Sequence, residues 1–267
     1  VIGEYTDLPE FAKFCKKAGF TLLQLLPVND TGTQSSPYSG LSAFALHPIF
    51  IDIRALPEFE AAYKDDAAFK KAYDKMLKDF PYSQAGRFNY MGILNAKTAL
   101  LNMLYEKSEV AKTGEADEAL AKWIKKNSWI ISYAVYKNLK VQYNQASWKE
   151  WKKSDQLIGA KEIKKRWSDK SMAKAHLFFA WTQMRANEQF KAATDAVKKA
   201  GIILKGDMPI LMNEDSCDAW AEPEIFNHNL RAGSPVDGEN PTGQNWGFPT
   251  YDWENLKARK YDWWIHR

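Results

Sequence analysis

The stretch GIILKGDMPILMNEDSCDAW, from Gly201 to Trp220, decides the fold class of this chain. The helical pattern before it ends in two lysines and Gly201, which is typical of a helix C-terminus. The apolar run Ile202 to Leu204 then predicts a short buried strand, and Gly206 and Pro209 end it by breaking regular pairing. A long helix followed by a buried strand indicates an α/β fold.

Asp207 follows this strand directly and is the first candidate functional residue. In parallel α/β folds, ligands bind at the carboxyl ends of the strands, where the connecting loops meet. A turn aspartate that bonds its own backbone explains the residue equally well when it is considered alone. The position therefore needs support from the rest of the chain.

The composition excludes several classes of protein. The chain has 267 residues, 45% of them hydrophobic, which is enough for one large domain or two smaller ones. Its formal net charge of +4 is too small to favour nucleic acid or an anionic membrane as a partner. We find no apolar run of membrane-spanning length and no signal peptide. Cys15 and Cys217 are predicted to be reduced thiols of a cytoplasmic protein. Because the chain begins with Val1, we expect a processed or excised piece.

The N-terminal region predicts a helix, a strand and a long polar loop. Apolar residues from Leu8 to Ala18 have helical spacing, and Gly19 closes that helix. The leucine-rich run 21–27 favours a buried strand. In the loop that follows, Ser36 and Tyr38 flank Pro37, and they suit a sugar whose ring stacks on the tyrosine. A simple turn with a partly buried tyrosine is the alternative that these residues alone favour.

The next segment predicts a second strand, at 49–53, preceded by His47 and Pro48. We interpret His47 as structural, because no metal-ligand spacing surrounds it.

From residue 58 to about residue 200 the pattern becomes helical. Predicted helices cover 67–78, 91–107, 117–125, 127–139, 161–167 and 172–199. Lysines are frequent between 149 and 174, with Trp148, Trp151 and Trp167 among them. Proteins that bind single-stranded nucleic acid also combine basic and aromatic residues in this way. Acidic residues interrupt this patch, so a solvated helix face is the preferred interpretation.

Beyond Asp207 the sequence predicts mainly loops. Gln244 and Trp246, framed by glycines, again combine a planar amide with an indole, as sugar-binding sites do. Residues 261–267 are expected to begin a helix.

Three stretches together resemble one known family: LLQLLPVNDTGTQSSPYSGLSAFALHPIFIDI (22–53), GIILKGDMPILMNEDSCDAWAEPE (201–224) and TGQNWGFPTYDW (242–253). They are similar, in the same order, to segments of the 4-α-glucanotransferases (amylomaltases or disproportionating enzymes, glycoside hydrolase family 77). The opening segment from Val1 to Leu8 is also similar to that family. Three motifs in one order are far more specific than any single one.

The resemblance implies a partial (β/α)8 barrel of the α-amylase type with a large inserted helical subdomain. We expect barrel portions at 1–58 and 171–267 and the helical subdomain at 59–170. The implied activity is transfer of α-1,4-glucan segments between malto-oligosaccharides by a retaining mechanism, with no metal or cofactor. Carried over by position, the substrate-binding residues are Ser36, Tyr38, Asp207, Gln244 and Trp246. Thr33 departs from the tyrosine that the family often has in this loop.

The family's catalytic carboxylates have no counterpart in this sequence. Its nucleophile lies in an Arg-x-Asp-His segment and its general acid in an Ala-Glu-Asp segment, and neither motif occurs here. We therefore assign no catalytic residue and expect both groups beyond Arg267. The few recognisable strands cannot close a barrel, so the remaining half of the barrel is the expected partner. We expect this chain alone to be inactive. The alternative hypothesis is a non-catalytic module that binds malto-oligosaccharides, or an inactive fragment.

Overall fold

The computed structural model describes residues 3–81 and 88–267; Val1 and Ile2 of the opening segment lie outside the described residues. The chain divides into two compact units, which are described separately. The first is formed by parts of residues 1–28, 46–128 and 169–207. The second is formed by residues 29–45, 129–168 and 208–267. The three-part division expected from the sequence stays a prediction.

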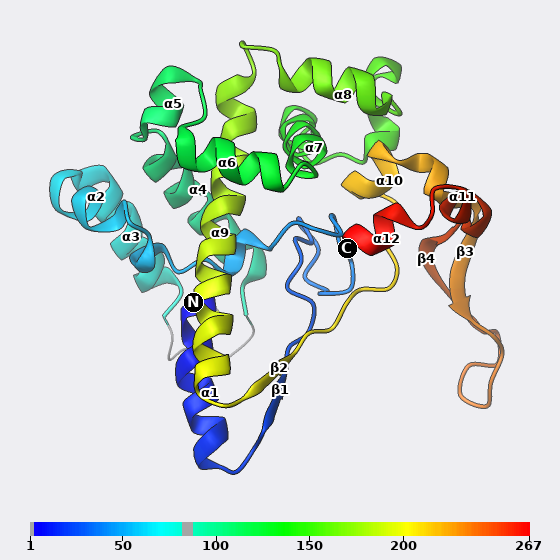
Figure 1. Ribbon diagram of the computed structural model, residues 1–267, viewed down its shortest axis with the longest axis horizontal. Coiled ribbons are helices and arrows are strands. Elements are labelled where there is room, and N and C mark those ends of the chain that lie inside the picture. Colours follow the sequence, from blue (N-terminus) through cyan, green and yellow to red (C-terminus); the bar gives the residue numbers. More distant parts are fainter. Residues whose placement is uncertain (1–2, 82–87) are drawn as a thin grey trace. The chain divides into compact units, whose positions relative to one another are not determined.

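A parallel pair of short strands lies at one end of the first unit (Figure 1). Strand β1 (Leu22–Gln24) pairs with β2 (Ile203–Lys205), with Leu22 opposite Ile203. Helices α1 (Leu8–Lys17) and α9 (Ala173–Lys199) pack together and against this pair. Their shared core consists of Ala12, Cys15, Val197 and Ile202. The predicted order of helix and strand is therefore confirmed in both segments.

The prediction that these two strands are buried is wrong. Ile203 is 64% exposed and Leu22 is 47% exposed. Among the described residues, β1 and β2 pair only with each other, so no further strand covers their outer edges. A two-stranded sheet has too little area to bury both of its faces. Apolar side chains therefore remain at the surface of this sheet.

Helices predicted from apolar spacing are confirmed through the middle of the chain. In the first unit, α3 (Ala67–Asp79), α4 (Tyr90–Tyr105) and α6 (Glu118–Lys126) match predicted helices and precede α9. Two further helices, α2 (Phe59–Asp65) and α5 (Glu109–Thr113), were not predicted. Asp66, Asn89, Ser108 and Asp117 cap four of these helices by accepting hydrogen bonds from backbone N–H groups of the first turn.

The strand predicted at 49–53 is wrong. The segment instead forms two short 3-10 helices, η2 (Pro48–Phe50) and η3 (Ile53–Ala55). In place of a strand partner, the buried ammonium group of Lys97 donates to the carbonyl oxygens of Ile49 at 2.7 Å and Ile51 at 2.8 Å. Lys97 also forms an ion pair with Glu4, and both side chains are buried. One cation thus satisfies backbone groups that a sheet would otherwise have paired.

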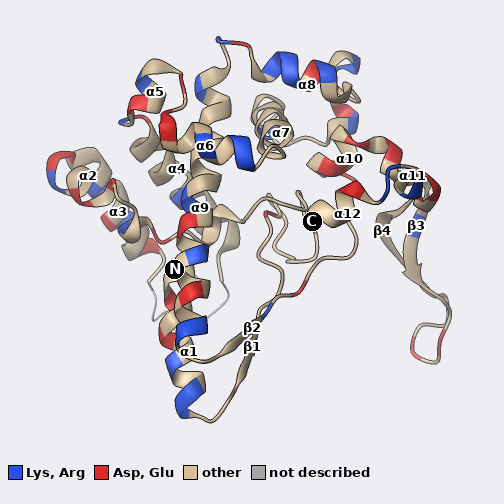
Figure 2. Ribbon diagram, in the orientation of Figure 1, with Lys and Arg blue, Asp and Glu red and all other residues tan. Residues whose placement is uncertain are grey.

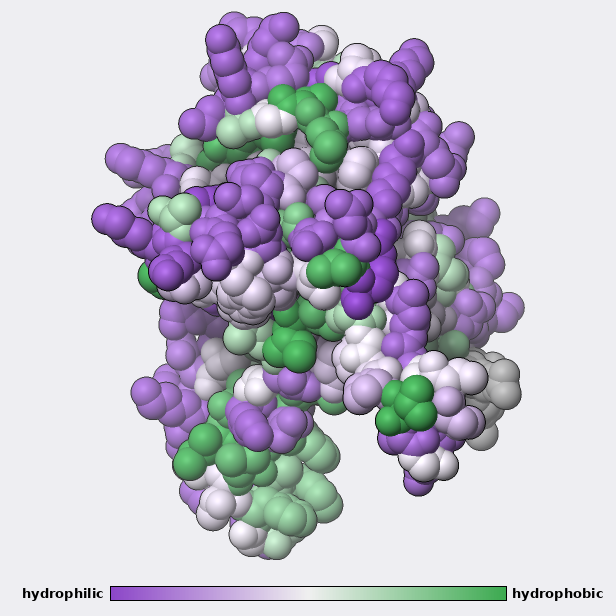
Figure 3. Space-filling model, turned by 90° about the vertical axis from the view of Figure 1, so that its right-hand side faces the viewer, coloured by the Kyte–Doolittle hydropathy of each residue, from purple (hydrophilic) through white to green (hydrophobic). Residues whose placement is uncertain are grey.

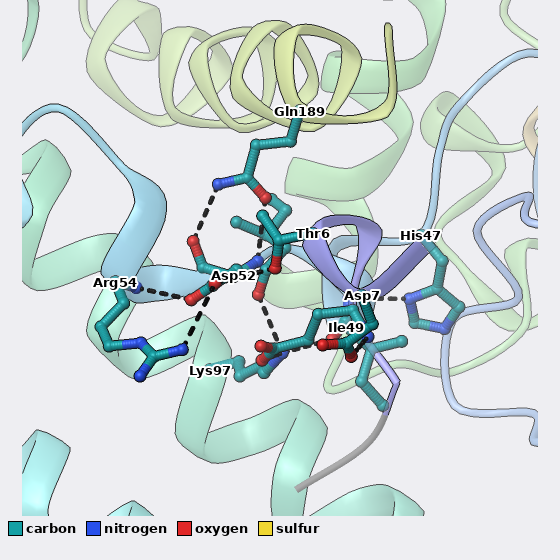
Figure 4. Close-up of polar contacts among 10 residues, drawn as sticks. Thr6, Asp7, His47, Ile49, Asp52, Arg54, Lys97 and Gln189 are labelled. Carbon is teal, nitrogen blue, oxygen red and sulfur yellow. Dashed lines mark hydrogen bonds and ion pairs between the residues drawn. The ribbon is translucent and has the colours of Figure 1, made fainter. Parts of the chain in front are cut away.

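Asp52 connects this turn to the helices around it (Figure 4). Its backbone N–H donates to Gln189 on α9 at 2.9 Å, and its carbonyl accepts from the same amide at 2.8 Å. Its carboxylate accepts from the hydroxyl of Thr6 and from the N–H of Arg54. His47 is also structural, because its Nδ1 accepts from Ile49 N–H and its Nε2 lies 2.7 Å from Tyr90 Oη.

The second unit contains helices and one β-hairpin. The helices are α7 (Ile130–Gln142), α8 (Gly159–Trp167), α10 (Cys217–Ala221), α11 (Trp253–Ala258) and α12 (Asp262–His266). The hairpin consists of β3 (Phe226–Ser234) and β4 (Gln244–Tyr251). Their core includes Met212, Ala219, Ile225, Phe226, Tyr251, Leu256 and Trp263. The predictions for α7, α8 and the C-terminal helix are confirmed.

The hairpin is the largest departure from the sequence prediction, which expected mainly loops beyond Asp207. Its pairing is antiparallel and irregular, with register shifts on both sides of Arg231. Pro249, which cannot donate to a neighbouring strand, lies opposite Arg231 at this irregularity. Glycine and proline in β4 predicted a loop, whereas the structure accommodates them in a distorted strand.

The face of the molecule drawn in Figure 3 is mostly hydrophilic, with hydrophobic residues exposed in patches. Basic residues gather on α8 (Figure 2), where Arg166 pairs with Asp155 and Glu162. Cys15 and Cys217 are both buried and form no disulfide. Within residues 3–81 and 88–267, no helix is both long and apolar enough to cross a membrane.

Candidate functional site

The polar loop that contains Ser36 and Tyr38 is closed by its own backbone. Asp30 N–H donates to Ala45 O at 2.8 Å, and Leu41 N–H donates to Asp30 O at 2.7 Å. Asn29 adds side-chain bonds to the carbonyl oxygens of Ser42 and Ala43. The two ends of residues 30–45 therefore lie side by side, and we call this segment the closed loop.

Helix α7 holds the closed loop from one side through Asp30. This carboxylate, on a side chain that is 1% exposed, accepts from Tyr133 Oη at 2.7 Å and Lys137 Nζ at 3.0 Å. Its other oxygen accepts from Gly32 N–H, where the backbone takes a positive φ of 59°. The ion pair fixes the start of the closed loop to a helix.

The segment 213–218 holds the other end of the closed loop. Asn213 N–H donates to Gly40 O at 3.3 Å, and Cys217 N–H donates to Leu41 O at 2.8 Å. Ala43 N–H then donates to the carboxylate of Asp218 at 2.8 Å. Two of the stretches that were singled out in the sequence are thus joined directly in the structure.

Ser36 and Tyr38 lie in one turn at the tip of the closed loop. Ser39 N–H donates to Ser36 O at 3.1 Å, which closes a four-residue turn around Pro37 and Tyr38. The side chain of Tyr38 is 46% exposed. A half-exposed ring fits both a sugar-binding residue and the alternative of a turn with a partly buried tyrosine, so the assignment of Tyr38 stays a prediction.

Gln244 and Trp246 are brought into direct contact on β4. The indole Nε1–H of Trp246 donates to Gln244 Oε1 at 2.8 Å, and Gln244 Nε2 donates to Asn240 Oδ1 at 3.0 Å. The indole is 47% exposed. The amide therefore orients a partly exposed indole, a kind of side chain that can stack on a sugar ring.

The hairpin beneath this pair is tightly built at one glycine. A Cβ on Gly233 would lie 1.9 Å from the carbonyl oxygen of Gln244, so only glycine fits there without a shift of the backbone. Gly247, just after Trp246, has a positive φ of 79°, and its backbone N–H donates to Asn245 Oδ1 at 2.9 Å. Close strand contact thus fixes the backbone that carries the amide and the indole.

Glu214 connects β3 to the rest of the second unit. Its carboxylate accepts from Arg231 Nη2 at 2.6 Å and pairs with Lys149 Nζ at 2.5 Å. Partial burial opposes ionisation, but Lys149, Arg231 and the nearby His228 outweigh it and lower the pKa of Glu214. An ionised carboxylate between two cations cannot serve as a general acid at neutral pH.

Asp207 belongs to the first unit, two residues after β2, and is described with that unit. Its expected place at the carboxyl end of a parallel strand agrees with the topology. Within the part of the chain that the structure describes, no cluster of three His, Cys, Asp or Glu side chains is arranged to hold a metal ion.

Two polar residues of the second unit, Asp218 and Arg231, were not identified from the sequence as candidate site residues. Asp218 is buried, and its bond to Ala43 spans 175 residues of sequence, so no local pattern indicates it. Arg231 lies in a segment predicted as a loop. A turn signal at Asp237 and Gly238, between two polar-apolar segments, was the one local sign of the hairpin.

Comparison with known proteins agrees with this reading of the sequence. A family model described as 4-alpha-glucanotransferase (glycoside hydrolase family 77) matches residues 1–267. The chain is 31% identical to a 4-alpha-glucanotransferase of Chlamydia caviae, over 100% of this chain and 48% of that protein. It is 34% identical to the one from Clostridium butyricum, over 97% of this chain and 52% of that protein.

Solved structures show the same fold. The amylomaltase from Streptococcus agalactiae, solved in complex with acarbose, matches with a TM-score of 0.75 at 23% identity, over 99% of this chain and 52% of that one. The amylomaltase from Corynebacterium glutamicum matches with a TM-score of 0.74 at 19% identity, over 97% of this chain and 35% of that one. The chain thus spans about half the length of the curated relatives it matches. Its sequence and fold place it in the 4-α-glucanotransferase family.

Proposed function

We propose that this chain supplies the sugar-binding part of a 4-α-glucanotransferase, which transfers α-1,4-glucan segments between malto-oligosaccharides. The observation that carries the proposal is the Gln244–Trp246 pair, an exposed indole oriented by a planar amide on the β3–β4 hairpin. A glucan presents apolar ring faces edged by hydroxyl groups. An indole stacks on such a face, while an amide or hydroxyl bonds to its rim.

The closed loop supplies the second half of the proposed site. Ser36 and Tyr38 present hydroxyl groups and a half-exposed ring in a single turn. We assign them to the donor glucan, and we assign Gln244 and Trp246 to the path of the acceptor. Asp207 is proposed to bond sugar hydroxyls and to support the surroundings of the nucleophile. These assignments follow the family resemblance residue by residue.

The proposed reaction is a retaining double displacement, in which two carboxyl groups about 5 to 5.5 Å apart act in turn. One forms a glycosyl-enzyme, and the other protonates the leaving sugar and then deprotonates the acceptor. In the second unit, Glu214 and Asp215 are held by lysine or arginine side chains, and Asp218 is held by two N–H groups. We therefore place the nucleophile and the acid/base in the part of the polypeptide that lies outside this chain.

The proposed partner of this chain is the remainder of its own barrel. The exposed side chains of Leu22 and Ile203 lie on a two-stranded parallel sheet, and Leu26 beyond β1 is 57% exposed. Parallel strands are usually buried on both faces, so these side chains suit further strands and helices. The match to about half of each relative supports this assignment. We also propose that the protein is cytoplasmic.

Product analysis with maltotriose tests the proposal. The complete polypeptide that contains this chain is incubated with maltotriose, and the products are separated by chain length. Disproportionation predicts glucose together with chains longer than maltotriose. Binding of maltotriose without any new product would instead leave a non-catalytic binding protein, and glucose with maltose alone would indicate hydrolysis.

A further inference from the structure

Asp218 is a buried carboxylate that the proposed reaction does not use. It lies on α10, and its side chain is held between two N–H donors from distant parts of the sequence. Oδ2 accepts from Ala43 N–H at 2.8 Å, and Oδ1 accepts from Trp263 Nε1–H at 3.0 Å. Each oxygen therefore serves a different segment of the second unit.

The first of these segments is the stem of the closed loop. Ala43 follows the Ser36–Tyr38 turn by five residues, and the carbonyl oxygens of Gly40 and Leu41 are bonded to Asn213 and Cys217. The bond from Ala43 to Asp218 is the last of these three contacts. Because hydrogen bonds are directional and apolar packing is not, this row of bonds fixes the register of the loop stem along segment 213–218.

The second segment leads to the base of the hairpin. Trp263 is 3% exposed, and its ring centroid lies 5.8 Å from that of Tyr251 and 6.2 Å from that of Phe226. Phe226 begins β3 and Tyr251 ends β4, and the two residues are paired across the hairpin. The indole that bonds to Asp218 therefore packs on the end of the hairpin opposite to Gln244.

We propose that Asp218 is a positioning residue for glucan binding, because its single carboxylate fixes the closed loop relative to the base of the hairpin. This inference rests on the proposed function, because it requires that the closed loop and the hairpin bind the same glucan. Asp218 touches no sugar itself. It acts through Ala43, which leads to Tyr38, and through Trp263, which leads to the strands that carry Trp246.

The substitution Asp218→Asn tests this role at nearly constant volume. An asparagine has one acceptor oxygen, so its NH2 group must face either Ala43 N–H or Trp263 Nε1–H. Adding Trp263→Phe removes one of the two donors, and the amide oxygen can then accept from Ala43. The control is Asp195→Asn, which changes an exposed carboxylate of α9 that forms an ion pair with Lys191. All variants are made in the complete polypeptide that contains this chain.

Two measurements are made on each variant: hydrogen exchange of residues 41–45, and the affinity for acarbose by calorimetry. We expect D218N to exchange faster in this segment and to raise the Kd for acarbose about tenfold. The double variant D218N/W263F is expected to recover to within about threefold of W263F alone. Asp195→Asn is expected to change neither quantity.

The outcomes separate this inference from the function on which it rests. Faster exchange in D218N with an unchanged Kd for acarbose overturns the positioning role. A Kd of D218N/W263F that is as high as that of D218N also overturns it. A wild-type protein that does not bind acarbose overturns the proposed function first. Should D218N not fold, W263F alone removes one of the two bonds and is expected to raise the Kd about threefold; an unchanged Kd would then contradict the inference.

Discussion

Trp246 and Gln244 form a side-chain pair on β4, with the indole Nε1 donating to the amide oxygen at 2.8 Å. Residues two apart on a strand point to the same face, so the strand itself brings the two groups together. The indole remains 47% exposed although its only polar atom is bonded. A ring that is oriented but uncovered is what stacking on a sugar requires.

Removing the amide should loosen the ring without removing it. Gln244→Ala is expected to weaken acarbose binding about fivefold, because one hydrogen bond is worth about 1 kcal/mol. Trp246→Ala should weaken binding more, by at least tenfold, since it removes the stacking surface. Trp253→Ala is the control with the same change of side chain, because Trp253 is 56% exposed but lies on α11. Equal effects of the 246 and 253 substitutions, measured by calorimetry, would contradict the assignment.

The hairpin should not tolerate a side chain at Gly233. Gly233→Ala places a Cβ 1.9 Å from the carbonyl oxygen of Gln244, so the two strands must separate. We expect weaker acarbose binding and faster hydrogen exchange across β3 and β4. Gly238→Ala, in the turn of the same hairpin, meets no atom within 4 Å and should change neither quantity. Similar results for the two alanines would show that the strand contact does not support the site.

The buried pair of Lys97 and Glu4 should matter for stability and not for binding. Lys97→Met leaves Glu4 and two backbone carbonyls without their cation, which should lower the free energy of unfolding by about 3–5 kcal/mol. The double variant E4Q/K97M should recover part of this loss, because no uncompensated charge remains. Lys191→Met, in an exposed pair, is the control and should change stability little. Urea denaturation measures all three, and equal losses for Lys97→Met and Lys191→Met would contradict this account.

Asp218 should make stability depend on pH. Burial raises the pKa of this carboxyl from 3.8 to about 6, partly offset by the bonds from Ala43 and Trp263 and by the charge of Arg267, and reinforced by Glu222. The folded state therefore keeps a proton that the unfolded state loses. This stabilisation is present below about pH 4 and is lost as the pH rises through 6.

The size of that change follows from the shift of about two pKa units, which corresponds to about 3 kcal/mol. The unfolding free energy of the wild type minus that of D218N should fall by about this amount between pH 3.5 and pH 7. A difference that stays constant over this range would show that folding does not raise the pKa of Asp218. At neutral pH the buried carboxylate lowers stability, which agrees with a residue retained to position the closed loop and the hairpin.

The sequence predicted the helices well because their signals are local. Asp66 and Asp117 cap helices that begin one residue later, and the apolar spacing of α9 holds over 27 residues. The strand predicted at 49–53 failed for a non-local reason. Its carbonyl oxygens are bonded by Lys97, a residue more than forty positions away, and apolar residues alone do not distinguish a strand from this turn.

The candidate site could be predicted only in part. Tyr38, Gln244 and Trp246 were chosen as candidates from the sequence, because aromatic rings stack on sugars and amides bond to sugar hydroxyl groups. The hairpin was missed, since Gly247 and Pro249 break the alternation by which strands are recognised. Asp218 could not be found, because its two partners lie 175 and 45 residues away and only the folded chain brings them together.

A crystal structure of the complete polypeptide with acarbose tests the central claim most directly. We expect sugar rings in contact with the Ser36–Tyr38 turn and the indole of Trp246, with hydroxyl groups bonded to Ser36 and Gln244. Acarbose bound elsewhere, with Tyr38 and Trp246 both untouched, would contradict it.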